Sequence, residues 1–430
     1  MHHTKKHYNV GMDIRILPKN SVGGGLVVPG DKSISHRALI LGALACGVTE
    51  VSGFLAGEDC LATARCLGQM GVEIEFTGEG VRVLGRGLHG LAAPGDVLYV
   101  GNSGTTIRLL AGLLAGQNFN AVLDGDASIR RRPMDRVVRP LAMMGAKIKG
   151  DFAPLHVEGA RLRGINYQMP LNSAQVKSAI LLAGLYARGR TVVRELGAGL
   201  TRDHTEIMIE HMRSAEGKLL GRGIVVPGDF SSAAFFIVAG LLLADEGGLL
   251  LEGVGVNPTR TGMLEALAAM GARIEVRRRR WANGEEIGDV FVRRSRLRGI
   301  VLEGGLVPRM IDEVPVFAVA AAFAEGVTVI RDAGELAVKE SNRIDAMAAG
   351  LGKMGARVEQ RVDGMSIQGG GVLRGAVVES YGDHRVAMAL GVAALGACGE
   401  TIIRDAGCVD VSFPGFFEVL NDIGFGRARL

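Results

Sequence analysis

Five side chains that could take part in chemistry lie between residues 32 and 37. They are Lys32, Ser33, Ser35, His36 and Arg37. An apolar run follows and stops at Gly47, a pattern that predicts a buried helix with its polar residues at the N-terminal end. Free backbone N–H groups and the positive end of the helix dipole favour an anion there. One such helix start is more simply explained as ordinary capping, but lysine and arginine beside it suit a phosphate or carboxylate.

The same arrangement of polar stretch, apolar helix and glycine occurs six times along the chain. The six glycines, each expected to end its helix in the left-handed conformation, are Gly47, Gly116, Gly189, Gly247, Gly326 and Gly399. Four copies continue with a Leu-x-x-Met-Gly segment, an alternating strand and a glycine-rich hairpin. We therefore predict six units of helix, strand, helix, strand and strand, which favour an α/β protein with two similar domains and a cleft between them.

The third unit is shorter than the others. Gly189 and Gly247 are 58 residues apart, whereas the other intervals span 69 to 79 residues. The segment 211–230 stands where other units carry their Met-Gly and strand pattern. We predict that the hairpin of this unit is truncated or absent, and two full-length strands between Met212 and Ile224 would contradict that.

Composition excludes several classes of function. The formal net charge of the 430 residues is +4 and aromatic residues make up 5%, which does not favour a nucleic-acid partner but suits small anions. The apolar run 233–244 is shorter than the roughly 18 residues of a membrane span. Five cysteines without a Cys-x-x-Cys pair, and an N-terminus without an apolar signal region, favour a cytoplasmic protein. Metal and nucleotide motifs are absent, so we expect neither metal nor cofactor.

Several charged stretches resemble, in order, the motifs of one family. PGDKSISHRA (29–38), GNSGTTIR (101–108), RRPMDR (131–136), VKESNRI (338–344) and GDHRVAMA (382–389) resemble those of the 5-enolpyruvylshikimate-3-phosphate synthases. GDKS (30–33), SAQVK (173–177), RDHTE (202–206) and NPTR (257–260) resemble the class II branch of that family. The resemblance extends from about residue 20 to the C-terminus.

The resemblance implies a fold. Enolpyruvyl transferases are two-domain inside-out α/β barrels, in which each domain holds three βαβαββ units. That agrees with the six units counted above, of which we expect the third to be shortened. By analogy, domain one would comprise residues 1–30 and 228–430, and domain two residues 31–227.

The resemblance also implies an activity of the shikimate pathway, in aromatic amino acid and chorismate biosynthesis. Family members transfer the enolpyruvyl group of phosphoenolpyruvate to the 5-hydroxyl of shikimate 3-phosphate by addition and elimination, through a tetrahedral intermediate, and release phosphate. The chemistry needs a base for the hydroxyl and an acid for the methylene carbon. Asp312 is the candidate base, Glu340 the candidate for protonating and deprotonating the methylene carbon, and Lys32 an assistant in proton transfer.

Family positions imply the substrate contacts as well. Those for shikimate 3-phosphate would be Lys32, Ser33, Arg37, Ser173, Ala174, Gln175, Arg202, Asp312 and Lys339. Those for phosphoenolpyruvate would be Lys32, Asn102, Gly104, Arg132, Gln175, Arg343 and Arg385. We expect small anionic substrates as the only partners, and a monomeric chain.

Two alternatives remain open at the level of sequence. One is the sister family that uses UDP-N-acetylglucosamine and carries a reactive cysteine before an Arg-Pro pair. Its equivalent here is about Ala127, and no cysteine lies between Cys66 and Cys398, which argues against it. The other is a non-catalytic repeat protein that binds anions, which would explain the helix starts but not Asp312, Glu340 and Lys32.

Overall fold

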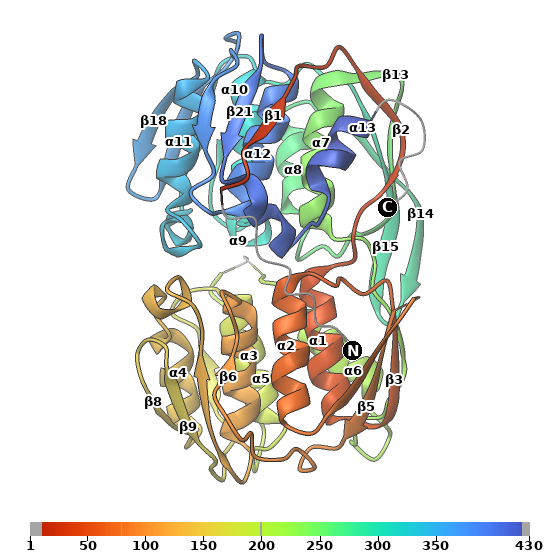
Figure 1. Cartoon of the computed structure of the whole chain (residues 1–430), viewed down its shortest axis with the longest axis vertical. Helices are drawn as coiled ribbons and strands as arrows, with labels where there is room; N and C mark the ends of the chain where they lie inside the picture. The colour runs from red at the N-terminus through yellow and green to blue at the C-terminus, as the bar shows by residue number, and fades with distance from the viewer. Residues whose placement is uncertain (1–10, 79, 198–199, 424–430) are drawn as a thin grey trace.

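The chain folds into two lobes stacked along its long axis (Figure 1). The computed structural model describes residues 11–78, 80–197 and 200–423. One hydrophobic cluster spans residues 16–28 and 230–423, and a second spans residues 34–226. We call the lobe around the first cluster, residues 11–30 and 228–423, the upper lobe, and residues 31–227 the lower lobe. The predicted domain one also includes residues 1–10 and 424–430, which lie outside the described residues.

Three helices are buried at the centre of each lobe. In the lower lobe these are α1 (Lys32–Leu44), α3 (Gly104–Ala115) and α5 (Ala174–Gly184); in the upper lobe they are α7 (Phe230–Leu243), α10 (Val314–Phe323) and α12 (His384–Leu395). Most of their side chains are buried on every face, because a helix apolar all round must be enclosed. The described helices include none long and apolar enough to cross a bilayer.

Outer helices and sheets surround these cores. The outer helices are α2 (Glu58–Gln69), α4 (Asp135–Met143), α6 (His204–Met212), α8 (Gly262–Ala269), α9 (Leu306–Met310), α11 (Arg343–Lys353) and α13 (Phe416–Asp422), with short 3₁₀ turns at Ile129–Arg131, Gly334–Val338 and Ala406–Val411. Four sheets share one topology, in which two parallel strands are continued by an antiparallel hairpin.

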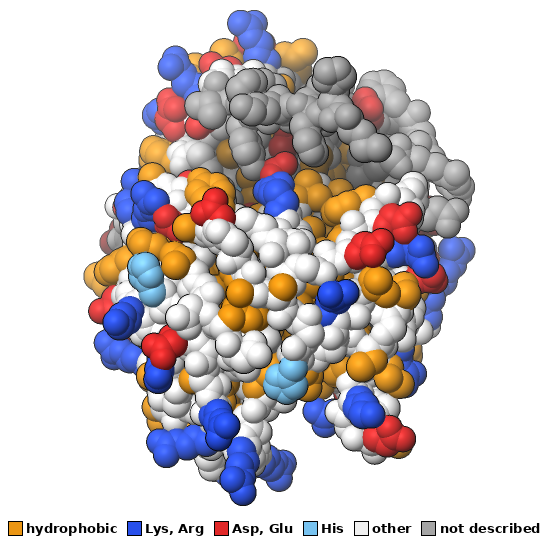
Figure 2. Space-filling view, turned by 60° about the horizontal axis from the view of Figure 1, so that its bottom comes forward, with side chains coloured by type: hydrophobic (Ala, Val, Ile, Leu, Met, Phe, Trp, Pro, Cys, Tyr) orange, Lys and Arg blue, Asp and Glu red, His pale blue; other side chains and the backbone are white. Residues whose placement is uncertain are grey.

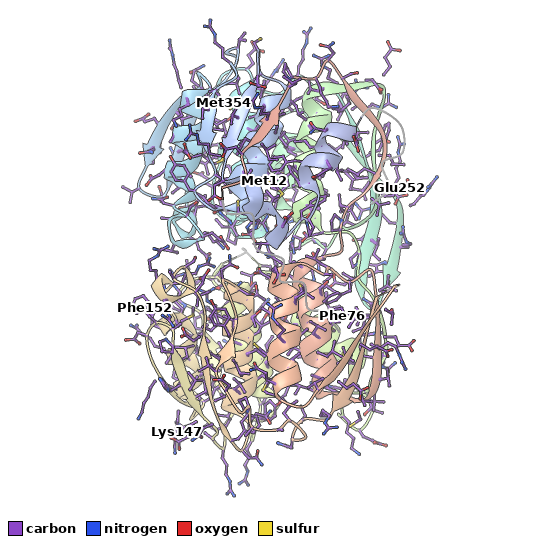
Figure 3. The ribbon with its side chains drawn as sticks, viewed as in Figure 1. Met12, Phe76, Lys147, Phe152, Glu252 and Met354 are labelled. Carbon is purple, nitrogen blue, oxygen red and sulfur yellow. The ribbon has the colours of Figure 1, made fainter. Side chains whose placement is uncertain are left out.

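Two of these four sheets lie in each lobe. In strand order, the first sheet of the lower lobe is β12 (Gly223–Val225), β3 (Cys46–Ser52), β5 (Gly80–Arg86) and β4 (Glu73–Thr77). The second sheet of the lower lobe is β6 (Leu98–Tyr99), β7 (Asn120–Asp124), β9 (Leu155–Glu158) and β8 (Lys147–Lys149). The first sheet of the upper lobe is β14 (Arg273–Ala282), β15 (Glu285–Arg293), β13 (Ala244–Gly255) and β2 (Val22–Val27). The second sheet of the upper lobe is β16 (Val301–Leu302), β17 (Val327–Ile330), β19 (Gly364–Gln368) and β18 (Arg357–Arg361). In Figure 3, the labelled Phe76 of β4 and Glu252 of β13 lie on the same side of the molecule.

Among the described residues, neither the third nor the sixth unit has a hairpin of its own. The described part of the third has the parallel pair β10 (Asn166–Gln168) and β11 (Val192–Arg194), and a single bridge between Arg213 and Leu219 follows α6. The predicted truncation is therefore confirmed. In the sixth unit, β20 (Val377–Glu379) and β21 (Thr401–Arg404) are completed by the N-terminal β1 (Ile14–Ile16). The sequence pattern predicts an incomplete hairpin in the third unit alone, so the sixth unit departs from that prediction.

The expected left-handed helix ends are wrong in position. Gly47, Gly189, Gly326 and Gly399 have φ between +91° and +94°, but each lies beyond its helix: Gly47 within β3, and the other three shortly before the next strand. Gly116 caps α3 with φ of −96°, and in the fourth unit the positive φ falls on Gly248. Helices such as α1 and α10 end on an extended residue, so the left-handed residue is needed later, where the chain turns.

The chain crosses between lobes twice, through two copies of one sequence, VVPGDKS (27–33) and VVPGDFS (225–231). Strand β2 precedes α1 but pairs with β13 of the upper lobe, whereas β12 precedes α7 but pairs with β3 of the lower lobe. Gly30 and Gly228 pair in an antiparallel bridge at the crossing. A Cβ atom on Gly30 would stand 1.8 Å from the carbonyl oxygen of Gly53, so the crossing requires glycine there.

Candidate active site

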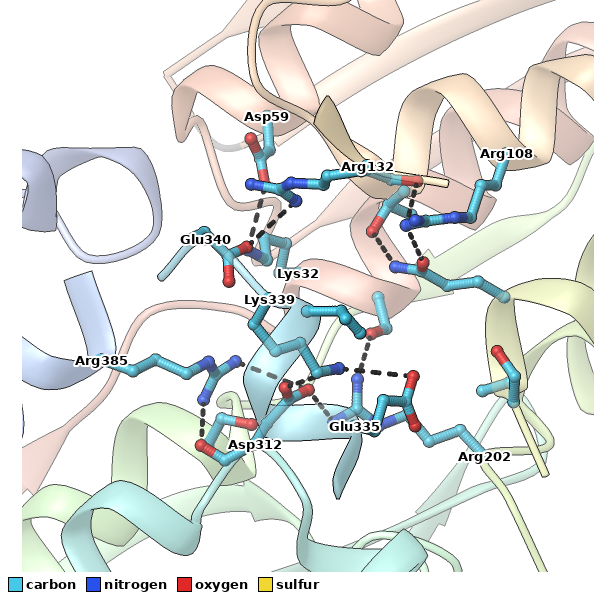
Figure 4. Close-up of a pocket in the computed structure, with 18 of the residues that line it drawn as sticks. Lys32, Asp59, Arg108, Arg132, Arg202, Asp312, Glu335, Lys339, Glu340 and Arg385 are labelled. Carbon is cyan, nitrogen blue, oxygen red and sulfur yellow. Dashed lines mark hydrogen bonds and ion pairs between the residues drawn. The ribbon is translucent and has the colours of Figure 1, made fainter. Parts of the chain in front are cut away.

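The pocket in the cleft is lined by helix starts and loops from both lobes (Figure 4). Among the described residues that line it, ten are lysine or arginine and five are aspartate or glutamate. On the outer end of the lower lobe, by contrast, charged side chains of both signs are scattered among apolar and neutral ones (Figure 2). Such a concentration of positive charge favours a ligand with several negative charges.

Every predicted site residue except Asn102 lines this pocket. Asn102 precedes Ser103, the N-cap of α3, and is not among the lining residues. The residues brought together are Lys32, Ser33, Arg37, Gly104, Arg132, Ser173, Ala174, Gln175, Arg202, Asp312, Lys339, Glu340, Arg343 and Arg385. The roles assigned to them stay predictions.

Lys32 is the first residue of α1 and reaches the start of α2. Its Nζ atom lies 3.0 Å from Asp59 Oδ2, and both side chains are largely buried. Burial lowers the pKa of Lys32, but the carboxylates of Asp59 and Glu340 together outweigh burial and raise the pKa above its ordinary value. Lys32 is therefore a fixed cation at neutral pH.

Arg37 lies one turn further along α1 and is held by three acceptors of the lower lobe. Its guanidinium donates to Thr205 Oγ1 at 2.7 Å, to Ser178 Oγ at 2.6 Å and to the Ser33 carbonyl oxygen at 2.8 Å. Ser173, the N-cap of α5, makes no capping hydrogen bond with its side chain. Arginine in a fixed orientation and an uncommitted hydroxyl at a helix start suit an anionic group.

The start of α3 packs directly against guanidinium groups. A Cβ atom on Gly104 would stand 2.8 Å from Nη1 of Arg108 and 3.1 Å from Nη1 of Arg132. Arg108 donates to Gln175 Oε1 at 2.7 Å, and Gln175 donates to Thr105 Oγ1 at 3.0 Å. The helix start and its cations therefore form one tightly fitted surface.

Asp312 of the upper lobe is surrounded by four cations. Arg202 of the lower lobe donates to its Oδ2 atom. Arg343 and Lys339 lie 3.4 and 3.6 Å from Oδ1, and Arg385 lies 3.8 Å from Oδ2. Burial would raise the pKa of Asp312, but these cations hold it well below its usual range, so the carboxylate is ionised.

Glu340 is the second carboxylate of the cleft. Its Oε2 atom accepts from Arg343 at 2.6 Å, and Oε1 lies 3.4 Å from Nη1 of Arg132 in the lower lobe. Burial would raise the pKa of Glu340, but Arg343 and Arg132 keep it well below its usual range. Both carboxylates thus pair with lower-lobe cations across the cleft, and a third such pair joins Arg136 to Glu335 at 4.0 Å.

Comparison with protein families matches residues 16–420 to the family model of EPSP synthase (3-phosphoshikimate 1-carboxyvinyltransferase). The chain belongs to the EPSP synthase family. Curated relatives named 3-phosphoshikimate 1-carboxyvinyltransferase include one from Citrifermentans bemidjiense, 52% identical over 95% of this chain and 98% of its own. Another from Desulforudis audaxviator is 53% identical over 96% of this chain and 99% of its own.

Solved structures agree with that family. An EPSP synthase from Acinetobacter baumannii superposes with a TM-score of 0.84 at 45% identity, covering 96% of this chain and 98% of that one. The enolpyruvyl transferase NikO from Streptomyces tendae, at 18% identity and a TM-score of 0.77, shows the same fold, covering 96% of this chain and 98% of that chain. The expected two-domain inside-out α/β barrel of the enolpyruvyl transferase type is confirmed.

Sequence reasoning about this EPSP synthase family member missed three structural side chains of the site. Asp59 looked like an ordinary acidic residue in a first helical turn, so no local signal set it apart. Arg108 lies in a quoted motif, but its contact with Gln175 requires α3 and α5 to be adjacent. Arg260 bonds both Asp31 and Asp229, and the duplicated VVPGD sequence was the signal that could have exposed this pairing.

Proposed function

We propose that this chain catalyses transfer of the enolpyruvyl group of phosphoenolpyruvate to the 5-hydroxyl of shikimate 3-phosphate, with release of phosphate, in the shikimate pathway. Family membership and the names of the relatives support this proposal. The observation that carries it is the pair of ionised carboxylates, Asp312 and Glu340, set among cations from both lobes opposite Lys32.

The two substrates share Lys32 and divide the other cations between them. We assign the phosphate of shikimate 3-phosphate to Ser173 and Arg202, and its carboxylate to Arg37. The open Ser173 hydroxyl and the fixed Arg37 guanidinium support this assignment. Ser33, Ala174, Gln175 and Lys339 complete that side.

Phosphoenolpyruvate is assigned to the cations nearer Glu340. Lys32, Arg132, Arg343 and Arg385 supply positive charge for a phosphate and a carboxylate, with Gly104 and Gln175 beside them. Planar guanidinium groups can bind both anions through paired hydrogen bonds.

In the first step Asp312 acts as base, and Glu340, which takes up a proton once the substrates are bound, acts as acid. The 5-hydroxyl loses its proton to Asp312 as its oxygen bonds to C2 of phosphoenolpyruvate, while C3 gains a proton from Glu340 and becomes a methyl group. In the second step Glu340 takes a proton back from that methyl group, the double bond re-forms and the C2–O bond to phosphate breaks. The leaving phosphate takes the proton held by Asp312, so both carboxyl groups return to their starting states. Lys32 and the arginines stabilise the charge that develops on the phosphate.

Substrate binding changes the proton affinity of these carboxylates. Without ligand, Arg202 is paired with Asp312 and Arg132 with Glu340, which makes both carboxylates weak bases. Anionic substrates that engage Arg202 and Arg132 neutralise those cations, so the pKa values of Asp312 and Glu340 rise toward the range where they can exchange protons.

Phosphate release tests the proposal against its alternatives. The purified chain is incubated with phosphoenolpyruvate and either shikimate 3-phosphate or UDP-N-acetylglucosamine, and inorganic phosphate is measured. We expect release only with shikimate 3-phosphate. Release with the nucleotide sugar, or no release by a chain whose folding is verified by circular dichroism, would overturn it.

The Glu340→Gln variant tests the proposed acid. It keeps the shape of the side chain but cannot exchange a proton, so turnover should fall about 10³-fold, within the range for a lost acid–base group. Affinity for shikimate 3-phosphate should change little. Near-normal turnover would refute the assignment.

We further propose that the protein is a cytoplasmic monomer. All proposed site residues come from one chain, and the five free cysteines suit a reducing compartment. Sedimentation of the active protein would reveal any larger assembly.

A further inference from the structure

His36 lies on α1 beside the proposed substrate contacts, yet no substrate role accounts for it. Its side chain is fully buried, and Nδ1 lies 2.8 Å from Thr63 Oγ1 on α2. The Thr63 hydroxyl lies 2.7 Å from that of Thr106, and Thr106 donates to Ser103 Oγ at 2.7 Å. These buried groups form a continuous chain of hydrogen bonds that joins α1, α2 and α3 within their first two turns.

The donor and acceptor of each hydrogen bond in this series can be assigned consistently. Ser103 Oγ, the N-cap of α3, accepts the backbone N–H of Thr106 at 3.2 Å as well as its hydroxyl. The Thr106 oxygen is then free to accept from Thr63, whose own oxygen accepts from an Nδ1–H of His36. Nε2 of His36 has no hydrogen-bond partner within the part of the protein that the structure describes, as expected for a ring whose single proton is on Nδ1.

The electrostatic surroundings agree with a neutral ring. Burial, followed by the charges of Lys32 and Arg37, lowers the pKa of His36 well below its ordinary value. A neutral imidazole can donate from one nitrogen only. The identity of that nitrogen therefore sets which atom donates in each hydrogen bond from His36 to Ser103.

Two features near Thr106 connect these hydrogen bonds to groups on the phosphoenolpyruvate side. Thr106 Oγ1 also lies 3.3 Å from the backbone oxygen of Asp59, whose carboxylate holds Lys32. Gly104, two residues before Thr106, has no room for a Cβ atom against Arg132. A small shift at the start of α2 or α3 would therefore move Lys32 or Arg132.

The shikimate 3-phosphate side is held independently. Arg37 bonds Thr205 and Ser178, neither of which belongs to the chain from His36. Loss of that chain should therefore affect the two substrates unequally.

We propose that His36 is a positioning residue for phosphoenolpyruvate, which donates from Nδ1 to Thr63 and so fixes the starts of α2 and α3 that place Lys32 and Arg132. This inference rests on the proposed function. His36 itself touches neither substrate.

Substitutions that move a single N–H group test the proposal. Asn places its amide N–H near the position of Nδ1, whereas Gln places it nearer Nε2 and Leu removes it. We expect His36→Leu and His36→Gln to raise KM for phosphoenolpyruvate about tenfold, the loss from one buried hydrogen bond, with KM for shikimate 3-phosphate within about twofold of wild type. His36→Asn should restore KM for phosphoenolpyruvate. Equal rises in both KM values, or no rescue by Asn, would overturn the proposal.

A double-mutant cycle tests the connection to Thr63. Thr63→Val should raise KM for phosphoenolpyruvate as His36→Leu does, and the double variant should be no worse than either single one, because both break the same chain. Additive effects would show that the two residues act separately and would contradict the proposal.

Nitrogen NMR of the imidazole separates this inference from the proposed function. In the wild-type protein we expect His36 to carry its proton on Nδ1 and not to titrate between pH 5.5 and 8. A proton on Nε2, or titration in that range, would overturn the inference even in an active enzyme. Lack of turnover by a folded wild-type protein would instead overturn the proposed function, and the NMR result would still decide the direction of the chain.

Discussion

The two copies of VVPGD lead into the first helix of each lobe, yet the helix starts differ in use. In the lower lobe the sequence continues with Lys32, and Arg37 follows one turn later, and both line the cleft. At the equivalent positions the upper lobe has Phe230 and Phe235, both buried in its core. The same backbone device therefore supports charged residues in one lobe and core packing in the other.

Arg260 forms ion pairs with both copies of the VVPGD sequence. Its Nη1 atom bonds Asp31 Oδ2 and its Nη2 atom bonds Asp229 Oδ1, each at 3.1 Å. The caps are nevertheless unequal in the backbone N–H groups that they bind among the described residues. Asp31 accepts from Ile34 N of its own helix, whereas Asp229 accepts from Ser231 N and also from Lys32 N of the other helix. Asp229, at the crossing into the upper lobe, thus helps to hold the start of α1 in the lower lobe.

The largest difference between the copies should appear in turnover. Lys32→Met removes a cation that lines the cleft together with the proposed proton-transfer groups, and kcat should fall about 10³-fold, as for loss of a transition-state contact. Phe230→Met, the matched change at the other copy, keeps an apolar side chain in the core and should leave kcat near normal. Steady-state phosphate release by both variants tests this, and an equal loss would contradict the division of roles.

Removing the shared cation should destabilise both copies at once. Burial lowers the pKa of Arg260, but Asp31 and Asp229 outweigh burial and raise it, so the residue is a permanent cation. Arg260→Met leaves two buried carboxylates without this partner and should cost about 3 kcal/mol in the free energy of unfolding.

Urea denaturation measures that cost, with Arg331→Met as its control. Arg331 pairs with Glu303, and both side chains are about half exposed, so the control should cost less than about 1 kcal/mol. Similar costs for the two variants would show that Arg260 does not link the crossovers.

The glycines of the two crossovers give a matched pair. A Cβ atom at Gly30 would meet the Gly53 carbonyl oxygen at 1.8 Å, whereas at Gly228 it would meet a methyl group of Val28 at 2.9 Å. A side-chain methyl can shift more easily than backbone, so Gly30→Ala should cost about 3 kcal/mol and Gly228→Ala about 1 kcal/mol. Equal shifts in the urea midpoint would mean that the two crossings are equally adaptable.

The smallest expected difference between the two copies is in how the free energy of unfolding depends on pH. His36 has a folded-state pKa well below that of the unfolded chain, and its equivalent in the second copy is Ala234. As pH falls below about 6.5, the unfolded state binds a proton that the folded state does not, which removes stability at up to about 1.4 kcal/mol per pH unit. His384, whose pKa burial and then Lys32 lower to about 3, adds a similar loss.

Urea denaturation at pH 7 and pH 5.5 tests the contribution of His36. The His36→Asn variant should lose less unfolding free energy between pH 7 and pH 5.5 than the wild-type protein does, because the contribution of His36 is gone. The contribution of His384 should remain. An unchanged pH dependence would show that His36 is protonated in the folded protein.

The helix starts and the repeat could be predicted from the sequence because their signals are local. An N-cap and an apolar run lie within a few residues, and the short third unit is visible as a difference in length. The pairing of β1 with β21 could not be predicted, since it joins Ile14 to Ile403 with no local pattern. The incomplete sixth unit was missed for the same reason.

The candidate site was predicted mainly through its resemblance to a family. Spacing alone indicated anion-binding helix starts, but which carboxylates face which cations depends on how the lobes meet. The pairing of Arg202 with Asp312 spans both lobes, and nothing near either residue in the sequence predicts it.

The exchange of first strands between lobes has a consequence for synthesis on the ribosome. The lower lobe has all its strands once the chain has grown to β12, whereas β2 must wait for β13 and β1 must wait for β21. The nascent chain therefore carries two unpaired N-terminal strands while a complete lobe folds behind them. Such edges can pair with other chains, so the upper lobe is the part most dependent on uninterrupted translation.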